Sequence, residues 1–205
     1  MAVAASQEAA LVNGVRAGDE RAFGRLVDTY GAGMRRFALS IVRNPAVADE
    51  VVQDSWLGVL RGLDRFEGRA SLRTWIFRIV ANTANTRAER ESRTVPFSTF
   101  AAEAAGEDPS VDPSRFRNPQ FPGGWTTFPK AWDQLEPRDA RAVVADAIER
   151  LPPAQRLVIS LRDVEGLSPD EICNVLELSE SNQRLLLHRA RSSVRAALEQ
   201  HLHPT

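Results

Sequence analysis

Three residues near the C-terminus have side chains that proteins use to recognise DNA bases. They are Arg184, Leu185 and His188, whose spacing places them on one side of a helix at about 100° per residue. An arginine can donate two hydrogen bonds to a guanine, and a leucine can pack against the methyl group of a thymine. No acidic residue lies between Ser181 and Arg195, although the whole chain has a formal net charge of -1. The sequence therefore predicts a cationic helix face suited to DNA.

The segment that must position these residues has the pattern of two helices joined by a short turn. Ser168 can cap the first helix, Pro169 fits its first turn, and Glu171 completes a capping box. Ser179 can cap the second helix, where Glu180 is favourable near the positive end of the helix dipole. The pattern predicts a helix-turn-helix, a motif that commonly binds DNA.

A helical wheel divides the second helix into an apolar and a polar side. The side expected to pack inward contains Leu187, Ala190, Val194 and Leu198. The side expected to face outward contains Ser181, Arg184, Leu185, His188, Ser192 and Arg195. An ordinary helical hairpin with a solvated arginine face is the alternative for any single run of charge. The two caps, the short turn and the absence of acids together favour DNA binding.

Length and composition restrict the function classes. The 205 residues suffice for one large or two small domains, with no run apolar enough to span a bilayer and no leader segment, so we expect a cytoplasmic protein. The single cysteine, Cys173, excludes an internal disulfide and is expected to be a buried small hydrophobe. No structural metal, cofactor or enzymatic site is expected, since the only metal candidate is the weak group Asp49, Glu50 and Asp54.

The first half of the chain has helical periodicity from Glu8 to about Arg93. A helix over residues 46–63 is predicted to carry an acidic and polar face with one exposed leucine. That face contains Glu50, Gln53, Asp54 and Leu57. An apolar residue within an acidic patch indicates a protein interface, although a solvated helix face is the commoner explanation.

A loop at residues 65–71 and a helix over about residues 72–91 follow. Arginines outnumber acids by eight to four between Arg61 and Arg93. A basic loop and helix with aromatic side chains can stack an unpaired base and hold its backbone. Trp75 and Phe77 can instead be core residues, and this is the preferred interpretation of Trp75.

We expect an all-α protein of two small helical domains joined by a long extended linker. The first domain is predicted over residues 8–94 and the second, with four helices, over residues 139–203. The linker, residues 95–138, has seven prolines that exclude a long helix, yet it keeps the aromatic residues Phe116, Phe121, Trp125, Phe128 and Trp132. A purely flexible tether rarely keeps so many aromatics, so some are expected to dock on a partner.

The ordered combination of these segments resembles the sigma-70 family of bacterial RNA polymerase sigma factors. It is most similar to the extracytoplasmic-function (ECF) group, which keeps only regions 2 and 4. ADEVVQDSWLGVL resembles region 2.2, and RFEGRASLRTWIFRIVANTA resembles regions 2.3 and 2.4. The segment ERLPPAQRLVISLRDVEGLSPDEICNVLELSESNQRLLLHRAR resembles region 4.

The resemblance implies a specificity subunit that binds core RNA polymerase, directs it to a promoter and helps to open the DNA. The implied polymerase contacts are Glu50, Gln53, Asp54 and Leu57. The implied contacts with the −10 element are Phe66, Arg69, Ser71, Arg78 and Asn82, with Phe66 and Asn82 at positions that capture a flipped base. The implied contacts with the −35 element are Ser181, Asn182, Arg184, Leu185, His188, Arg189, Arg191 and Arg195, the last two towards phosphates.

Two departures from the family pattern limit what the resemblance implies. Gln183 occupies an inward position where the family usually has valine, and Leu185 and Leu186 replace more polar residues. The promoter sequence therefore does not transfer from relatives. The resemblance also implies that an anti-sigma factor is a partner, and the linker is one segment that it could bind. It further implies that the linker passes through the channels of the polymerase.

Two other function classes remain open from the sequence. A conventional repressor or activator would bind its operator without polymerase and usually as a dimer, but no dimerisation helix is apparent. A helical adaptor that binds only proteins would leave the acid-free arginine face unexplained.

Overall fold

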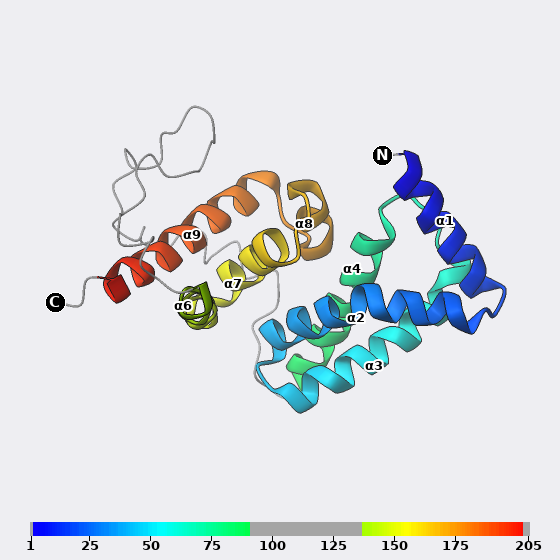
Figure 1. Cartoon of the computed structure of the whole chain (residues 1–205), viewed down its shortest axis with the longest axis horizontal. Coiled ribbons are helices and arrows are strands. Elements are labelled where there is room, and N and C mark those ends of the chain that lie inside the picture. Colours follow the sequence, from blue (N-terminus) through cyan, green and yellow to red (C-terminus); the bar gives the residue numbers. More distant parts are fainter. Residues whose placement is uncertain (1, 91–136, 203–205) are drawn as a thin grey trace.

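The computed structural model describes residues 2–90 and 137–202, and every regular element in these two ranges is a helix (Figure 1). The all-α expectation is therefore confirmed. The predicted linker lies almost wholly outside the described residues.

The first domain contains four α-helices and one short 3-10 turn. They are α1 (Ala2–Arg16), α2 (Glu20–Val42), α3 (Pro45–Gly62), η1 (Leu63–Arg65) and α4 (Leu72–Arg90). The second domain contains α6 (Pro137–Arg150), α7 (Pro153–Ile159), the π-helical turn η5 (Ser160–Val164), α8 (Pro169–Leu176) and α9 (Glu180–Leu202). Compared with the expected domain limits, α1 begins six residues earlier and α6 two residues earlier.

Local side chains determine where the helices of the first domain start. The Asp19 carboxylate accepts a hydrogen bond from the backbone N–H of Arg21 at the start of α2. Asn44 caps α3 in the same way, with Pro45 in its first turn. Gly68, with φ +71°, allows the sharp loop between η1 and α4.

Helices α2, α3 and α4 pack against one another around a buried core. Phe37 and Phe77 are each 1% exposed, and their ring centroids lie 5.6 Å apart. Phe77 is therefore a core residue. Trp75 is only partly buried and packs against Phe66, with ring centroids 5.0 Å apart.

The two domains lie against each other, with α7 and α8 facing α2 and α4 (Figure 1). One continuous apolar cluster contains Phe77 from the first domain together with Leu161 and Ile172 from the second. A smaller cluster fills the space between α6, α7 and α9. The second domain thus has a small core of its own and shares a larger one with the first.

Candidate DNA and protein interfaces

The predicted helix-turn-helix is present as α8, a short turn and α9. The Ser168 hydroxyl accepts from the Glu171 N–H at 3.2 Å, and the Glu171 carboxylate accepts from the Ser168 N–H at 2.9 Å, which confirms the capping box. The Ser179 hydroxyl accepts from the Asn182 N–H at 3.3 Å. Glu177 adopts the left-handed conformation that ends α8.

The first two turns of α9 present most of the predicted DNA-contacting side chains to solvent. Ser181, Arg184 and His188 are exposed, while Asn182 and Leu185 are partly buried. Gln183 is 1% exposed, as its inward position in the sequence predicted. The start of α9 therefore has a polar outer side with two cationic or titratable groups.

The outward assignment of Ser192 and Arg195 is wrong for this structure, and Arg189, which the resemblance implies as a −35 contact, is also buried. Arg189 is 8%, Ser192 is 2% and Arg195 is 6% exposed. A helical wheel assumes one covered side, whereas α9 packs against α6, α7 and α8. The accessible part of the predicted DNA face is therefore confined to the N-terminal part of α9 and to the half-buried Arg191.

Arg184 and Arg191 of α9 pair with carboxylates. Arg184 pairs with Glu180 one helical turn earlier at 2.9 Å, and both side chains are more than 60% exposed. Arg191 makes two hydrogen bonds, of 2.6 and 2.9 Å, to the Asp163 carboxylate of η5. The hydrogen bond to Asp163 raises the pKa of Arg191 above its usual value. The acid-free run of α9 is thus partly neutralised by acids from outside it.

The predicted −10 residues lie along the loop after η1 and the exposed side of α4. Arg69 and Asn82 are exposed, and Phe66 is partly buried against Trp75. Arg69 pairs with Glu67 at 2.5 Å. Ser71 and Arg78 instead have partners in the second domain, so the structure does not present all five residues together at a free surface.

Ser71 and Arg78 bind two glutamates of the helix-turn-helix. The Ser71 hydroxyl donates to the Glu171 carboxylate at 2.6 Å, and Thr74 donates to the same oxygen at 2.8 Å. Arg78 donates to the Glu177 carboxylate at 2.7 Å. These contacts could not be predicted from local sequence.

Hydrogen bonds from both domains lower the pKa of the Glu171 carboxyl. Burial of its carboxyl raises the pKa, but hydrogen bonds from Ser71, Ser168 and Thr74 outweigh this effect and lower the pKa to about 2. The carboxylate therefore stays ionised at neutral pH and accepts hydrogen bonds from both domains.

The predicted polymerase patch lies on the outer face of α3. Glu50, Gln53 and Asp54 are exposed, and Leu57 is 49% exposed. The sequence interpretation missed Leu60, which lies one turn further along α3 and is 43% exposed. The spacing of three residues from Leu57 was the signal that could have identified it.

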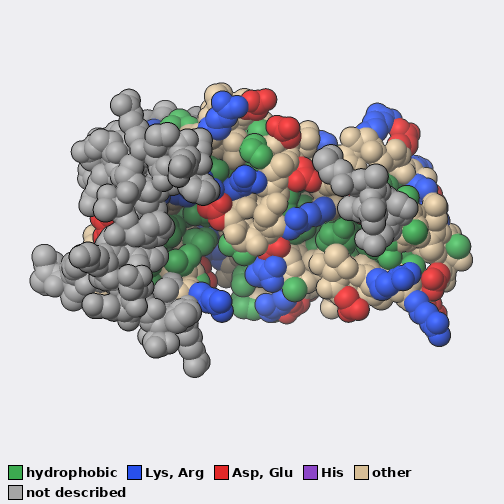
Figure 2. Space-filling model, turned by 45° about the horizontal axis from the view of Figure 1, so that its top comes forward, with side chains coloured by type: hydrophobic (Ala, Val, Ile, Leu, Met, Phe, Trp, Pro, Cys, Tyr) green, Lys and Arg blue, Asp and Glu red, His purple; other side chains and the backbone are tan. Residues whose placement is uncertain are grey.

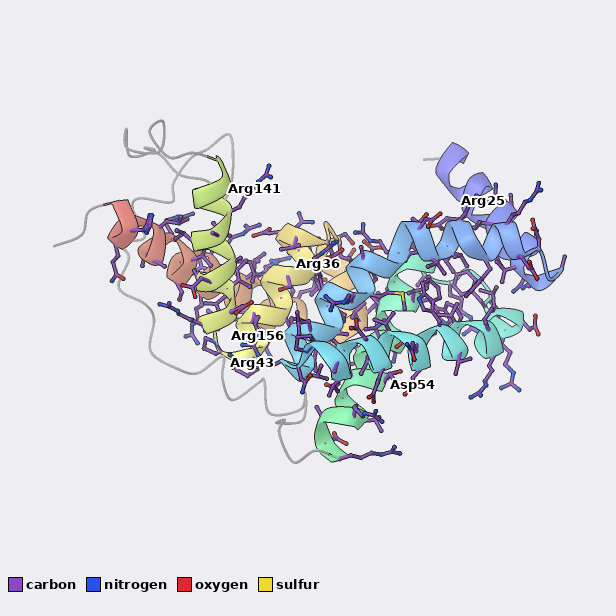
Figure 3. All side chains as sticks on the ribbon, turned by 60° about the horizontal axis from the view of Figure 1, so that its bottom comes forward. Arg25, Arg36, Arg43, Asp54, Arg141 and Arg156 are labelled. Carbon is purple, nitrogen blue, oxygen red and sulfur yellow. The ribbon has the colours of Figure 1, made fainter. Side chains whose placement is uncertain are left out.

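The acidic patch and the predicted −10 surface meet in one pocket of about 300 Å³. Asp54 comes from α3, and Figure 3 labels it on the outer side of that helix. Asn82 and Thr86 come from α4, together with Arg87, which pairs with Glu50. The two predicted surfaces are therefore neighbours, and the pocket offers hydrogen-bond donors, acceptors and a cationic wall to a polar ligand.

The similarity to known proteins assigns the family. Residues 26–94 match the model of sigma-70 region 2, and residues 141–194 match the model of sigma-70 region 4. The chain is 30% identical over 184 residues to an ECF RNA polymerase sigma-E factor of Salmonella typhimurium, a match that covers 90% of each chain. The chain belongs to the ECF group of the sigma-70 family. The RNA polymerase sigma-H factor of Pseudomonas aeruginosa is 29% identical over 197 residues, or 94% of each chain.

Two solved structures of sigma factors have a similar fold. The structure of CnrH in complex with the cytosolic domain of CnrY matches with a TM-score of 0.59 and 25% identity, covering 94% of this chain and 97% of that one. The sigma factor RpoE in complex with the anti-sigma factor NepR, from Bartonella quintana, matches with a TM-score of 0.57 and 20% identity. It covers 86% of this chain and 96% of that one, and supports the fold alone.

On the face of this sigma factor that Figure 2 shows, basic side chains are interspersed with acidic ones. Region 2 and region 4 of an ECF factor direct promoter-specific initiation, and sigma factors are initiation factors rather than classical enzymes. Among residues 2–90 and 137–202, no group of three His, Cys, Asp or Glu side chains is arranged to hold a metal ion. No helix within these ranges is both long and apolar enough to cross a membrane.

An apolar groove of about 770 Å³ runs between region 2 and region 4 of this sigma factor. Its walls come from the end of α2 and from α6, α7 and η5, and include Val144 and Ile148. Four arginines also line it, namely Arg36, Arg43, Arg141 and Arg156 (Figure 3). We name this feature the junction groove.

Proposed function

We propose that this ECF factor binds core RNA polymerase, directs it to promoters through their −35 and −10 elements, and promotes opening of the promoter. The observation that carries the proposal is the occurrence in one chain of a capped helix-turn-helix with an exposed polar start and an acidic, leucine-bearing patch on α3. A repressor requires the first surface but has no use for the second. The domain limits 8–94, 95–138 and 139–203 belong to the same proposal.

Region 4 is proposed to place the start of α9 in the major groove of the −35 element. Arg184 would donate to a guanine, and Leu185 would pack against a thymine methyl. Arg191 would contact a phosphate after leaving Asp163, since a phosphate can replace the carboxylate as a two-oxygen acceptor. Arg189 and Arg195 would take part only if α9 became more exposed than it is here.

Region 2 is proposed to bind the −10 element as separated strands. Phe66 can stack on an unpaired base, and Asn82 can hydrogen-bond to its edge. Arg69, Ser71 and Arg78 would hold the backbone nearby. A captured base lowers the cost of keeping the strands apart, so binding here favours the open promoter.

The outer face of α3 is proposed to bind the polymerase. Leu57 and Leu60 supply an exposed apolar pair, and the exposed polar residues Glu50, Gln53 and Asp54 precede it on the same helix. An apolar centre with a polar rim is the usual composition of a protein interface. Since the polymerase and the promoters of a bacterium are in the cytoplasm, the protein is proposed to act there.

Transcription in vitro tests this proposal. Purified protein is added to sigma-free core polymerase and a DNA fragment from upstream of its own gene. We expect a discrete transcript that is lost when Gln53 and Asp54 are both changed to alanine. Tight DNA binding without core and no transcript with core would support a repressor and overturn the proposal.

An anti-sigma factor is the third proposed partner, as in the similar solved complex of RpoE with NepR. The junction groove supports this proposal because it touches both regions and combines apolar walls with arginines. An amphipathic helix that carries carboxylates along one edge has the matching chemistry. The linker, also expected to bind such a partner, lies outside the described residues.

Two alanines of α6 give a matched test of the groove. Ala145 lines the junction groove and is exposed, whereas Ala142 is exposed but does not line it. We expect Ala145→Glu to abolish copurification with the anti-sigma partner from the native bacterium and Ala142→Glu to leave it unchanged. Equal copurification of the two variants would place the anti-sigma factor elsewhere.

A further inference from the structure

Arg16, the last residue of α1, binds the backbone of the turn that follows α3. Its Nε and Nη2 donate to the Leu63 carbonyl oxygen at 3.1 and 2.8 Å, and Nη2 also donates to the Phe66 carbonyl oxygen at 2.6 Å. Arg16 is 47 positions from Leu63 and 50 from Phe66 in the chain. One guanidinium therefore joins two carbonyl groups of the turn that carries Phe66.

The position of this guanidinium has a physical cause. Carbonyl groups at the C-terminal end of a helix lack partners within the helix and carry the negative end of its dipole, so a cation is stabilised there. Helix α3 ends at Gly62, and η1 continues it from Leu63 to Arg65. The fork of N–H donors of an arginine can bind two carbonyl groups at once. Arg16 thus closes the end of α3 and η1 and holds Phe66 with the same group.

The donor and the first acceptor are both fixed to the core of region 2. Val12, one turn before Arg16, is 5% exposed and belongs to the buried core. Helix α1 approaches α2 closely at Gly14, where a β-carbon would lie 2.8 Å from the β-carbon of Ala22. Leu63 is 2% exposed and belongs to the same core. The hydrogen bonds of Arg16 therefore connect the Phe66 backbone to a rigid support.

The ring of Phe66 is held separately by Trp75 of α4. The two ring centroids lie 5.0 Å apart, with the planes inclined at 43°. Trp75 in turn packs closely on α3 at Gly62, where a β-carbon would lie 3.0 Å from the indole ring. A side chain that is ordered before its ligand arrives binds more tightly, because no ordering cost remains at the moment of binding. Arg16 holds the backbone and Trp75 the ring, so Phe66 is preorganised.

We propose that Arg16 is a positioning residue for the capture of an unpaired −10 base, which acts by holding the backbone of Phe66 and does not itself touch DNA. This inference rests on the proposed function, which assigns base stacking to Phe66. Without Arg16 the turn adopts other conformations, and the affinity for the separated strand falls in proportion to the fraction that presents the ring. Arg16 is not among the residues proposed to contact the −10 element.

The affinity of the holoenzyme, reconstituted from core polymerase and the full chain, for a single strand tests this role. The probe is a fluorescein-labelled oligonucleotide with the −10 sequence of the promoter that the transcription experiment defines. We expect Arg16→Ala to weaken binding about tenfold, as a competent fraction near one-tenth would give. Arg25→Ala is the control and should bind as the wild type does, because Arg25 is an exposed arginine of region 2 on α2 (Figure 3). Equal affinities of Arg16→Ala and Arg25→Ala would overturn the proposal.

An abasic site in the strand separates positioning from a general effect on the fold or the charge. Abasic sites are introduced one at a time, and the captured position is the one at which Phe66→Ala causes no further loss of affinity. Arg16→Ala should also cause no further loss there, because both variants remove the same interaction with the base. Equal losses on the intact and the abasic strand would show that Arg16 acts on a phosphate or on the fold, and the proposal would fail.

Arg16→Lys keeps the test decisive if Arg16→Ala fails to fold. Lysine retains the positive charge and the aliphatic stem but has one nitrogen in place of the fork. We expect Arg16→Lys to bind the intact strand more weakly than the wild type and to lose nothing further on the abasic strand. Wild-type affinity of Arg16→Lys for the intact strand would show that charge alone suffices, which contradicts a positioning role.

Phe66→Ala distinguishes failure of the positioning role from failure of the proposed function. If Phe66→Ala binds the intact strand as tightly as the wild type does, the proposed base stacking is wrong. If Phe66→Ala weakens binding while the Arg16 variants do not, base stacking stands and only the positioning role of Arg16 is wrong.

Discussion

The Ser71 hydroxyl at the start of α4 lies 2.6 Å from the Glu171 carboxylate in the cap of α8, although the two residues are 100 positions apart in the chain. One carboxylate thus stabilises a helix start in region 4 and binds region 2. Any change at Glu171 should affect both the stability of α8 and the contact between the regions.

The protonation of Glu171 should make stability depend on pH at acid values. Its pKa is lowered from 4.5 to about 2, so its contribution is full above pH 4.5 and is lost as the pH falls towards 2. The group is only partly buried, so solvent screening reduces the expected contribution to about 1 kcal/mol. This contribution is measured by urea unfolding of the wild type and Glu171→Gln between pH 2 and 7, with circular dichroism as the signal. Parallel stability curves for the two proteins over this range would contradict the assignment.

Arg184 should read one base pair of the −35 element. Arg184→Ala is expected to cost about 1 to 3 kcal/mol of binding to the best site and to relax specificity at one position. Arg150→Ala is a matched control, because Arg150 also pairs with an acid four residues earlier, Asp146, and is exposed to a similar degree, 77% against 76%. Competition binding with single-base variants of the promoter, in the presence of core, measures both. A uniform loss of affinity for all DNA sequences would indicate that Arg184 contacts a phosphate instead.

Asp163 should restrain the binding of Arg191 to DNA. Removing its charge with Asp163→Asn removes the acceptor that competes with a phosphate for Arg191, so nonspecific DNA affinity should rise. Arg191→Ala should lower that affinity and reduce the salt dependence by about one phosphate contact. Titrations over a series of salt concentrations determine both quantities, and equal affinities for Asp163→Asn and wild type would exclude this role.

Leu57 should contribute to polymerase binding through its exposed side chain. Leu57→Ser is expected to weaken core binding about tenfold or more, since truncation of a central apolar contact commonly costs more than 1 kcal/mol. Val164→Ser is the control, because Val164 has the same exposed fraction of 49% but lies on η5. Fluorescence anisotropy measures the affinity of each variant for core polymerase. A similar loss of affinity for core in both variants would show that Leu57 has no specific role in the contact.

Helices α8 and α9 have some features that nearby residues predict and others that they do not. The capping box of Ser168 and Glu171 was predictable because it involves groups three residues apart. The inward position of Gln183 was also predictable, since it is close to the capped start of α9. The burial of Ser192 and Arg195 was not, because it depends on how α6 and α7 pack against the later turns of α9.

The sequence by itself determined the helical class, the helix starts, the helix-turn-helix and the family motifs, because caps and amphipathic periods act over three or four residues. Only the tertiary structure decided that Glu165 pairs with Arg36, 129 residues away, and that Gly33 leaves the space for this contact. It also decided that Asp54 and Asn82 share a pocket. These relationships arise from the packing of whole helices, and no local preference in the chain encodes the distance between two such surfaces.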